Sequence, residues 1–468
     1  MIALTLAEIA EAVGGTLDSA DPATLVTGPV DRDSRLMGPG GLFACVVGER
    51  VDGHDFVGTA IAAGAVAVLA TRPVGVPAVL VEDVVAALAK LGRAVIDRAP
   101  GLAVVGLTGS AGKTSTKDLI AQVLARHGET VFTEGSLNNE IGAPLTAAKV
   151  TDGTRHLVLE MGARHKGDIA YLTTIAPPTV GLVLNVGTAH VGEFGSKAKI
   201  AEAKGELVEA LTSEGTAVLN ADDPLVRAMA ERTKARVLLF GESPDAEIRA
   251  TGVRLDATGR PSFTLVTPAG SAPVQLRLYG EHHVSNALAA AAVAAALGMS
   301  VDDTAAALGA AGALSRWRME VVERADGVTV VNDAYNANPE SMRAALRALV
   351  SMGGRGPERR RTWAVLGEMR ELGEDSLNEH DAIGRLAVRL DVTKLVAVGD
   401  RDAACMELGA RNEGSWGEES VLVSDADAAI ELLRGQLQPG DVVLVKASRS
   451  VGLERVAEAL LADDGAVR

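Results

Sequence analysis

A glycine-rich turn gives the most specific signal in the sequence: Gly106-Leu107-Thr108-Gly109-Ser110-Ala111-Gly112-Lys113-Thr114-Ser115-Thr116. An apolar strand pattern over residues 102–107 leads into the turn, and a helix pattern follows from Lys113 to about residue 126. Glycines allow successive backbone N–H groups to converge on a phosphate, and the start of the helix adds positive potential. In such a loop Lys113 meets the charge of the β- and γ-phosphates, and the Thr114 hydroxyl binds Mg²⁺.

The turn therefore predicts a nucleoside triphosphate site lined by Gly109, Ser110, Ala111, Gly112, Lys113, Thr114 and Ser115. Its two loop glycines stand closer together than in the general form of the motif. A glycine turn that merely begins an ordinary helix is the alternative. The sequence lacks the Asn-Lys-x-Asp motif that reads a guanine base, which argues against a GTPase switch.

The strand before the turn belongs to an alternating pattern of strands and helices, which is typical of a parallel sheet with crossover helices. Its buried-strand runs are at 102–107, 157–160, 180–185 and 217–220. Glu160 ends one run and His190 follows another, so both are expected at the carboxyl edge that carries the turn. Taken alone, Glu160 could cap a helix and His190 could be structural. Lys204, flanked by acids on a predicted helix, is by itself best interpreted as a surface ion pair.

Changes in the pattern of apolar runs and turn residues divide the chain into three predicted α/β domains: 1–99, 100–316 and 317–468. The first is the smallest, with strands at 65–69 and 78–81, and a Pro-Gly linker follows it. Within the second, alternating residues near 250–280 predict a small antiparallel insertion. The third, a Rossmann-like domain, has its predicted strands at 328–331, 362–366, 394–398, 420–423 and 442–445.

Composition narrows the class of protein. Of 468 residues, 45 are Lys or Arg and 61 are Asp or Glu, so the net charge is −16, and 47% of residues are apolar. This excludes a mainly disordered chain and argues against binding to nucleic acid or an anionic membrane. The basic run at 359–361 is therefore expected to be a solvated loop.

The cysteines and the apolar runs of the sequence indicate the cellular compartment. Two cysteines far apart indicate neither a disulfide scaffold nor a zinc module. The longest apolar run, residues 287–299, is too short to span a bilayer and predicts a buried helix. Without a signal-peptide pattern, we expect a cytoplasmic protein that does not insert into membranes.

Several segments together resemble the ATP-dependent Mur ligases, which form amide bonds in peptidoglycan precursors. The segments are 109–114, 157–162, 185–190 and 203–206, with further matches at 33–35, 41–43, 52–56, 137–144, 333–339, 366–373 and 446–450. The resemblance covers nearly the whole chain. It implies a central ATPase domain, ATP and two Mg²⁺ as cofactors, and a monomer with two small-molecule substrates, UDP-MurNAc-tripeptide and D-alanyl-D-alanine.

The resemblance also implies roles for individual residues. Lys113, His190 and Arg318 would be catalytic, and Thr114, Glu160, His190 and a carbamylated Lys204 would bind metal. ATP would further contact Asn286, Arg318, Asp333 and Asn336. Ser34, Arg35, Asn138, Asn139, Lys446, Ser448 and Arg449 would bind the substrates. This sequence departs from the family at several positions, among them Trp317, where glycine is usual.

The implied reaction activates a carboxylate as an acyl phosphate, which the amine of the dipeptide then attacks. Positioning and charge neutralisation carry such chemistry, so no nucleophilic side chain is expected. Because Arg318 and Asp333 lie in the third domain and serve ATP in the second, we expect domain closure to complete the site. The alternatives are a sibling ligase that adds the third amino acid, a folylpolyglutamate synthase, or an ATPase or switch without ligase activity.

Overall fold

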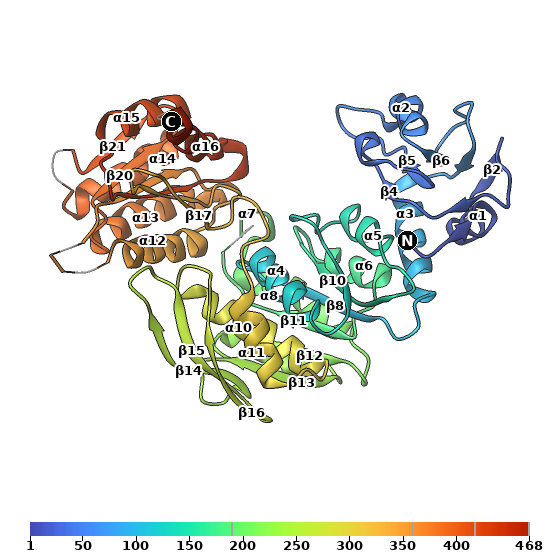
Figure 1. Cartoon of the computed structure of the whole chain (residues 1–468), viewed down its shortest axis with the longest axis horizontal. Coiled ribbons are helices and arrows are strands. Elements are labelled where there is room, and N and C mark those ends of the chain that lie inside the picture. Colours follow the sequence, from blue (N-terminus) through green and yellow to red (C-terminus); the bar gives the residue numbers. More distant parts are fainter. Residues whose placement is uncertain (189–190, 355, 358, 416–417, 467–468) are drawn as a thin grey trace.

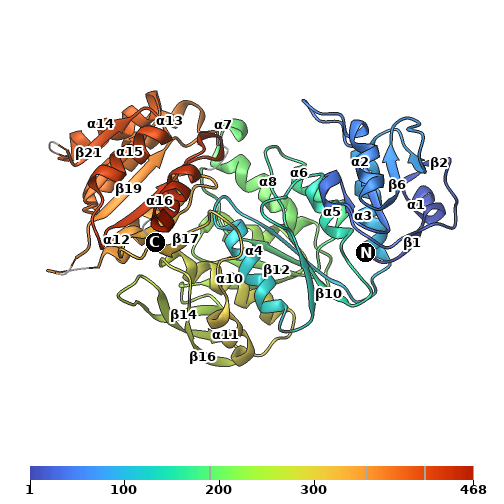
Figure 2. The same ribbon diagram turned by 45° about the horizontal axis from the view of Figure 1, so that its top comes forward.

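The computed structural model describes residues 1–188, 191–354, 356–357, 359–415 and 418–466. Three lobes form an open V: the N-terminal lobe (β1 to α3) and the C-terminal lobe (β17 to α16) both rest on a middle lobe (β8 to α11) (Figure 1). A view turned by 45° shows the same arrangement, with the two outer lobes on opposite sides of the middle lobe (Figure 2). The chain therefore has the predicted class of three α/β domains, and the exact boundaries at 99/100 and 316/317 stay a prediction.

The N-terminal lobe contains a five-stranded sheet in the order β2-β7-β6-β5-β4 and a separate β1–β3 pair. Its first helix begins at a capping box in which Thr5 and Glu8 satisfy each other's backbone N–H groups. Its elements are β1 (Leu4–Thr5), α1 (Leu6–Val13), β2 (Thr16–Asp18), β3 (Leu25–Val26), β4 (Val30–Asp31), η1 (Ser34–Leu36), β5 (Gly41–Ala44), η2 (Gly53–Phe56), α2 (Val57–Ala62), β6 (Ala65–Ala70), β7 (Ala78–Leu80) and α3 (Val84–Asp97).

The middle lobe is built on a nine-stranded sheet in the order β16-β15-β14-β13-β12-β11-β8-β10-β9. Its strands are β8 (Ala103–Thr108), β9 (Glu129–Phe132), β10 (Thr154–Glu160), β11 (Val180–Val183), β12 (Thr216–Asn220), β13 (Arg236–Gly241), β14 (Ile248–Leu255), β15 (Pro261–Thr267) and β16 (Gly270–Gln275). Its helices are α4 (Lys113–Leu124), α5 (Gly142–Ala147), α6 (Asp168–Ile175), α7 (Val191–Phe194), α8 (Lys197–Glu209), α9 (Pro224–Arg227), η3 (Ala228–Arg232), α10 (His282–Ala296) and α11 (Val301–Ala310).

Two features of this sheet differ from the sequence prediction. Strands β9 and β13 were not predicted. Strand β9 is short and half polar, so it lacks a clear apolar run, whereas β13 contains the apolar run 237–240, which the sequence prediction overlooked. The antiparallel strands β15 and β16 are not a separate insertion. They extend the central sheet through β14, which pairs in parallel with β13.

Apolar residues cover the central sheet on both faces, as buried parallel strands require. Val105 and Val158 lie in a cluster with α4, α10 and α11, whereas Val104 and Leu157 lie in another with α3, α5 and α8. Helix α10 is the predicted buried alanine helix, and it packs against α4, which follows the glycine turn. Within the described residues, none of the helices is both long and apolar enough to cross a membrane.

The C-terminal lobe holds a six-stranded sheet in the order β17-β18-β22-β19-β20-β21, parallel except for β17. All five predicted strands form, to within one residue at each end. The elements are β17 (Glu320–Glu323), β18 (Thr329–Asn332), α12 (Pro339–Gly353), β19 (Thr362–Gly367), η4 (Gly373–Asp375), α13 (Ser376–Arg389), β20 (Lys394–Val398), α14 (Arg401–Glu413), β21 (Ser420–Val423), α15 (Ala426–Gln436), β22 (Val442–Lys446), η5 (Arg449–Val451) and α16 (Glu454–Ala466).

The basic run in this lobe is not the solvated loop that was predicted. Arg361 forms a two-point ion pair with Asp441, which is buried, and Trp363 donates to the same carboxylate at 2.9 Å. Arg360 donates to the backbone oxygens of Gly440 and Gly327. These contacts fasten the start of β19 to the turn before β22, because buried carbonyls and carboxylates need donors.

Candidate functional site

Three neighbouring strand ends build the centre of the site. Strand β8 runs between β10 and β11 in the sheet, and all three are parallel. The glycine turn follows β8, Glu160 ends β10, and Asn185 follows β11. Because parallel strands end at the same edge, the turn and both polar side chains meet at the carboxyl edge of the sheet.

Asn185, which follows the neighbouring strand β11, fixes the shape of the glycine turn. Asn185 Oδ1 accepts hydrogen bonds from the backbone N–H groups of Ser110 and Ala111 at 3.0 and 2.9 Å, and its Nδ2 donates to Ala111 O at 3.1 Å. Gly112 precedes α4 with φ = 77°, a conformation that favours glycine. Asn185 was not among the predicted site residues, although an amide directly after an apolar strand was a signal for it.

Lys113 begins α4 and carries the positive charge of the turn. Its Nζ donates to Gly109 O at 2.8 Å. Burial lowers the pKa of Lys113, and nearby Glu160 partly opposes that shift. The ammonium group is thus held over the loop by a neutral carbonyl, and a phosphate arriving there would gain a charge-assisted hydrogen bond.

Hard oxygen ligands lie beside the turn. Thr114 Oγ1 donates to Glu160 Oε2 at 2.9 Å, and Asn138 Nδ2 donates to Glu160 Oε1 at 2.8 Å. Glu160 is only 1% exposed. A hydroxyl and a carboxylate at this point fit Mg²⁺, which takes few protein ligands and completes its shell with phosphate and water. In keeping with such an incomplete set, the described residues contain no group of three or more His, Cys, Asp or Glu side chains able to hold a metal.

Lys204 on α8 lies at the same edge. It is 4% exposed and lines the same cleft as Lys113 and Glu160. Burial, with the neighbouring charge of Lys113, lowers the pKa of Lys204 well below its usual range. The surface ion pair expected from residues alone is therefore wrong. His190, the remaining predicted metal ligand, lies outside the described residues.

Arg318 brings the C-terminal lobe to the glycine turn. Its guanidinium donates to Thr114 Oγ1 at 3.2 Å and lies over the Tyr335 ring at 4.2 Å. Two further contacts join the lobes: Asn338 Nδ2 donates to Ser110 O at 3.3 Å, and Glu340 accepts from the Thr188 N–H at 2.9 Å. Sequence reasoning missed Asn338 and Glu340, since no local pattern indicates that α12 meets the turn.

The predicted substrate residues of the C-terminal lobe already have hydrogen-bond partners within that lobe. Lys446 Nζ donates to Asp333 Oδ2 at 2.6 Å and to Asn336 O at 2.9 Å, and both Lys446 and Asp333 are buried. Ser448 Oγ accepts from the Arg370 N–H at 2.9 Å. Arg449 is half exposed and pairs with Glu454 through one N–H. Arg449 thus keeps donors for a ligand, whereas Lys446 acts first as the partner of Asp333.

In the middle lobe, two predicted asparagines have structural partners. Asn286 lies against the turn, so that a Cβ on Gly112 would be 2.9 Å from its Oδ1. Asn139 Oδ1 accepts from the Gly142 N–H at 3.0 Å, at the start of α5. Both side chains still line the cleft described next.

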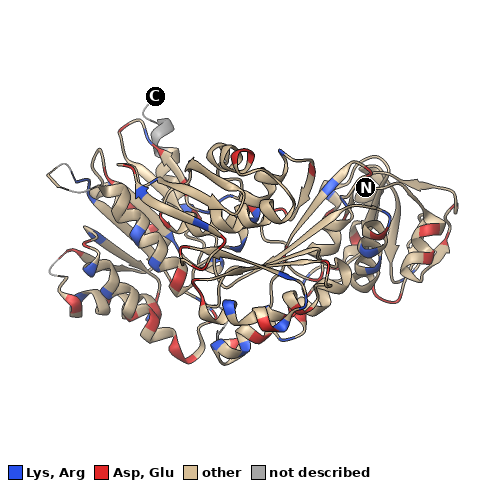
Figure 3. Ribbon diagram, turned by 90° about the horizontal axis from the view of Figure 1, so that it is seen from below, with Lys and Arg blue, Asp and Glu red and all other residues tan. Residues whose placement is uncertain are grey.

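A cleft of about 1150 Å³ joins these groups and receives residues from all three lobes. Of the predicted site residues it is lined by Ser110, Ala111, Gly112, Lys113, Thr114, Ser115, Asn138, Asn139, Glu160, Lys204, Asn286, Arg318, Asp333, Asn336, Lys446, Ser448 and Arg449. Elsewhere, basic and acidic residues are interspersed over all three lobes (Figure 3). A chain with net charge −16 thus gathers several cations at one cleft.

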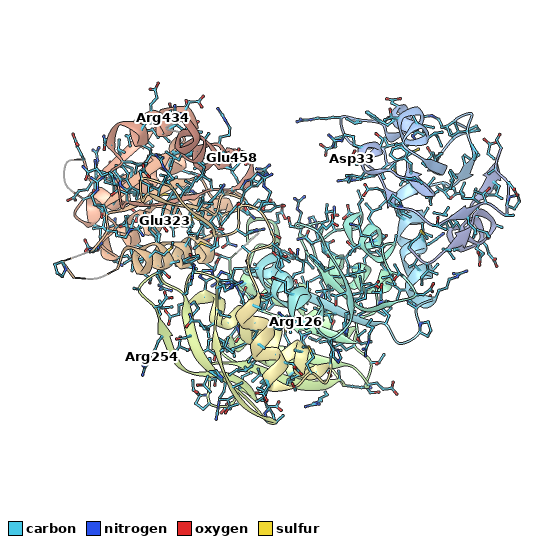
Figure 4. All side chains as sticks on the ribbon, viewed as in Figure 1. Asp33, Arg126, Arg254, Glu323, Arg434 and Glu458 are labelled. Atoms are coloured by element: carbon cyan, nitrogen blue, oxygen red, sulfur yellow. The ribbon has the colours of Figure 1, made fainter. Side chains whose placement is uncertain are left out.

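The N-terminal lobe contributes a residue that was not predicted. Ser34 is buried, and Arg35 forms a two-point ion pair with Asp33 that lowers the pKa of Asp33 to about 2. Neither Ser34 nor Arg35 lines the cleft, but Arg32 does. Asp33 lies on the side of the N-terminal lobe that faces the C-terminal lobe (Figure 4).

Three family models match this chain in order along its length. Residues 30–105 match the Mur ligase family catalytic domain, residues 107–294 the Mur ligase middle domain, and residues 317–449 the glutamate ligase domain of Mur ligases. The chain is 52% identical to the UDP-N-acetylmuramoyl-tripeptide–D-alanyl-D-alanine ligase of Mycobacterium tuberculosis, and 100% of each chain is covered.

Solved structures agree. MurF from Acinetobacter baumannii superimposes with a TM-score of 0.87 at 32% identity, covering 98% of this chain and 99% of that one. MurF ligase from Thermotoga maritima in complex with ADP gives 0.80 at 32% identity, with 95% and 99% covered. The resemblance seen in the motifs is thereby confirmed over the full length, and the chain belongs to the Mur ligase family.

Proposed function

We propose that this chain joins D-alanyl-D-alanine to UDP-N-acetylmuramoyl-tripeptide at the expense of ATP, giving the pentapeptide, ADP and phosphate in the cytoplasm. The observation that carries the proposal is the contact of Arg318, from the C-terminal lobe, with Thr114 in the glycine turn. This contact places the proposed nucleotide site of the middle lobe and the proposed dipeptide site of the C-terminal lobe in one cleft. The names of the full-length relatives support this choice of substrates, and the ADP complex of one relative supports the nucleotide.

The reaction proceeds in two steps. An oxygen of the terminal tripeptide carboxylate attacks the γ-phosphorus of ATP, the bond to the β-phosphate oxygen breaks, and ADP leaves behind an acyl phosphate. The dipeptide amine then attacks the acyl carbon, loses a proton, and expels phosphate from a tetrahedral intermediate. The first step develops negative charge on phosphoryl oxygens, and the second develops it on the acyl oxygen and then on the leaving phosphate. Catalysis therefore depends on positioning and charge neutralisation.

This chain's residues serve those two needs. Asn185 fixes the shape of the turn by accepting from the Ser110 and Ala111 N–H groups. The remaining N–H groups of the turn, at the start of α4, would orient the phosphates. Lys113 and Arg318 approach from different lobes and neutralise the charge that develops on the transferred group. Asn286, Asp333 and Asn336 would contact the rest of the nucleotide, and all three line the cleft.

Thr114, Glu160, His190 and a carbamylated Lys204 would hold Mg²⁺, at up to two positions. When bound, the metal would neutralise charge on the β- and γ-phosphate oxygens. Carbamylation converts a buried amine into an oxygen ligand, and it requires the neutral amine that a lowered pKa provides. We expect activity to fall in buffer depleted of carbon dioxide and to return with bicarbonate. An activity indifferent to bicarbonate, with an unmodified Lys204 in an intact-mass measurement, would contradict this role.

The remaining predicted residues would bind the two substrates. Asn138 and Asn139 line the cleft beside the turn, and Ser34 and Arg35 would serve the UDP end from the N-terminal lobe. Lys446, Ser448 and Arg449 would bind the dipeptide carboxylate. Because three lobes contribute, we expect the C-terminal lobe to close on the bound substrates and exclude water. Small-angle scattering with an ATP analogue and both substrates should show compaction.

The decisive experiment measures phosphate release with ATP and Mg²⁺ while each substrate is supplied or omitted, and determines the product mass. We expect release that requires both UDP-MurNAc-tripeptide and D-alanyl-D-alanine, with a pentapeptide product. Release with a shorter muramoyl peptide and a free amino acid would identify a sibling ligase instead. Release without any acceptor would identify an ATPase.

A further inference from the structure

The segment that enters the C-terminal lobe has an unusual backbone. Trp317 has φ = 57° and Met319 has φ = 49°, both in the left-handed region. Residues other than glycine rarely adopt this backbone conformation, because their Cβ atom crowds the following carbonyl oxygen. A bulky residue with a positive φ requires compensating contacts, so the contacts of Trp317 indicate what stabilises this conformation.

Trp317 contacts two arginines that are far apart in the sequence. The Arg449 guanidinium lies over the indole ring at 4.2 Å from its centroid, and that of Arg316 lies at 5.2 Å. Each arginine also pairs with an acid of α16: Arg449 with Glu454 at 2.6 Å, and Arg316 with Glu458 at 3.6 Å. Glu458 lies on the side of the C-terminal lobe that faces the N-terminal lobe (Figure 4).

Neighbouring side chains of this segment have different surroundings. Arg318 reaches Thr114 in the glycine turn, whereas Trp317 lies behind Arg449, and the Trp317 carbonyl accepts from the Tyr335 N–H at 3.2 Å. Arg449 and Arg318 line the cleft, but Trp317 does not. An indole face attracts a guanidinium and restricts its rotamers, while it leaves the N–H edge free to bind a carboxylate.

We infer that Trp317 is a positioning residue for acceptor binding: it holds the Arg449 guanidinium so that its free N–H groups meet the carboxylate of the acceptor dipeptide. Trp317 itself touches neither substrate. The glutamate of α16 takes one N–H of Arg449, and the ring fixes the plane of the remaining donors. This inference rests on the proposed function, because the acceptor carboxylate is the ligand it assigns to Arg449.

The test compares the KM for D-alanyl-D-alanine with the KM for ATP in the full chain, from phosphate release at saturating levels of the other substrates. Glycine at position 317 removes the ring and adopts the positive φ freely. We expect W317G to raise the KM for the dipeptide about three- to tenfold, the range of one partly exposed cation–π contact. The KM for ATP should stay within about twofold of the wild-type value, and the melting temperature should not fall.

Two further variants separate positioning from a structural role. W317F keeps an aromatic face under the guanidinium and should restore most of the affinity for the dipeptide. R449Q should raise the same KM, and W317G should add nothing in that background, because the ring acts only through Arg449. An unchanged dipeptide KM in W317G, equal shifts for both substrates, or additive effects with R449Q would each overturn the inference. Failure of the wild-type chain to make pentapeptide would instead overturn the proposed function.

Discussion

The two contacts that the middle lobe makes with its neighbours are chemically different. Towards the N-terminal lobe a single apolar core runs through both lobes and includes Leu6 of α1, Leu91 of α3 and Leu145 of α5. Towards the C-terminal lobe the contacts named above are polar: Arg318 with Thr114, and Glu340 with Thr188. An apolar core resists opening because opening exposes apolar surface to water, whereas a polar contact can replace its hydrogen bonds by hydrogen bonds to water at a smaller net cost.

From this difference we expect the C-terminal lobe, rather than the N-terminal lobe, to move when substrates bind. The segment between the lobes is fastened to α4 by Gln122, which exchanges two hydrogen bonds with Gly312, and by Asp118, which accepts from the Ser315 N–H. Since α4 begins at the glycine turn, we expect phosphate binding at the turn and the position of the C-terminal lobe to be coupled through this helix. Four substitutions test this comparison.

The largest effect should come from the buried ion pair that underlies the polar contact. Lys446→Met leaves the Asp333 carboxylate buried without its cation, and we expect a loss of about 3–5 kcal/mol in the stability of the C-terminal lobe. Urea unfolding followed by tryptophan fluorescence measures it. The exposed Lys197→Met serves as the control, and equal unfolding of the two variants would show that the pair contributes no stability.

Removing an apolar side chain should damage the other contact. Leu91→Ala empties a fully buried position of the shared core, so we expect a loss of about 2–5 kcal/mol in stability. Catalytic rates of the folded fraction should remain near wild type. Leu408→Ala, at an exposed leucine of α14, provides the matched control. A rate defect without a stability loss would contradict the view that this contact is a rigid support.

Arg318→Ala should show the opposite pattern. It removes a charge that crosses the polar contact to the glycine turn, and we expect kcat to fall about 10²–10³-fold, as for loss of one transition-state donor. The melting temperature should change little. Arg347→Ala, an exposed arginine of α12 in the same lobe, should leave kcat unchanged. A near-normal kcat in Arg318→Ala would contradict the proposed role of Arg318 in charge neutralisation.

The smallest effect should come from Glu340. Its Oε1 accepts from both the N–H and the hydroxyl of Thr188, two residues before His190 in the sequence. Glu340→Ala should lower kcat/KM about tenfold, which corresponds to about 1.4 kcal/mol for a charge-assisted contact. Glu431→Ala on α15 is the control. If both variants match wild type, this contact plays no part in arranging the site.

Sequence alone located the parts of the site that are contiguous. The turn at 106–116 is recognisable because one short segment supplies the glycines and the lysine expected to bind a phosphate and the hydroxyl expected to bind Mg²⁺. Glu160 was also found, since strand ends of a parallel sheet share one edge. The five parallel strands of the C-terminal sheet were predicted almost to the residue, because buried parallel strands are continuous apolar runs. The antiparallel strand β17, which carries Glu320 and Glu323, was not predicted.

The remaining features depend on pairs of residues that only the folded chain brings together. Lys446 could be named as a cation, but its pairing with Asp333 joins residues 113 positions apart. Arg35 and Arg32 look alike in sequence, yet one is bound to Asp33 and the other reaches the cleft. Local sequence thus determined the apolar parallel strands and the glycine turn. Long-range packing decided which charges are paired and which remain free to bind a ligand, because pairing depends on the neighbours of each charge in space.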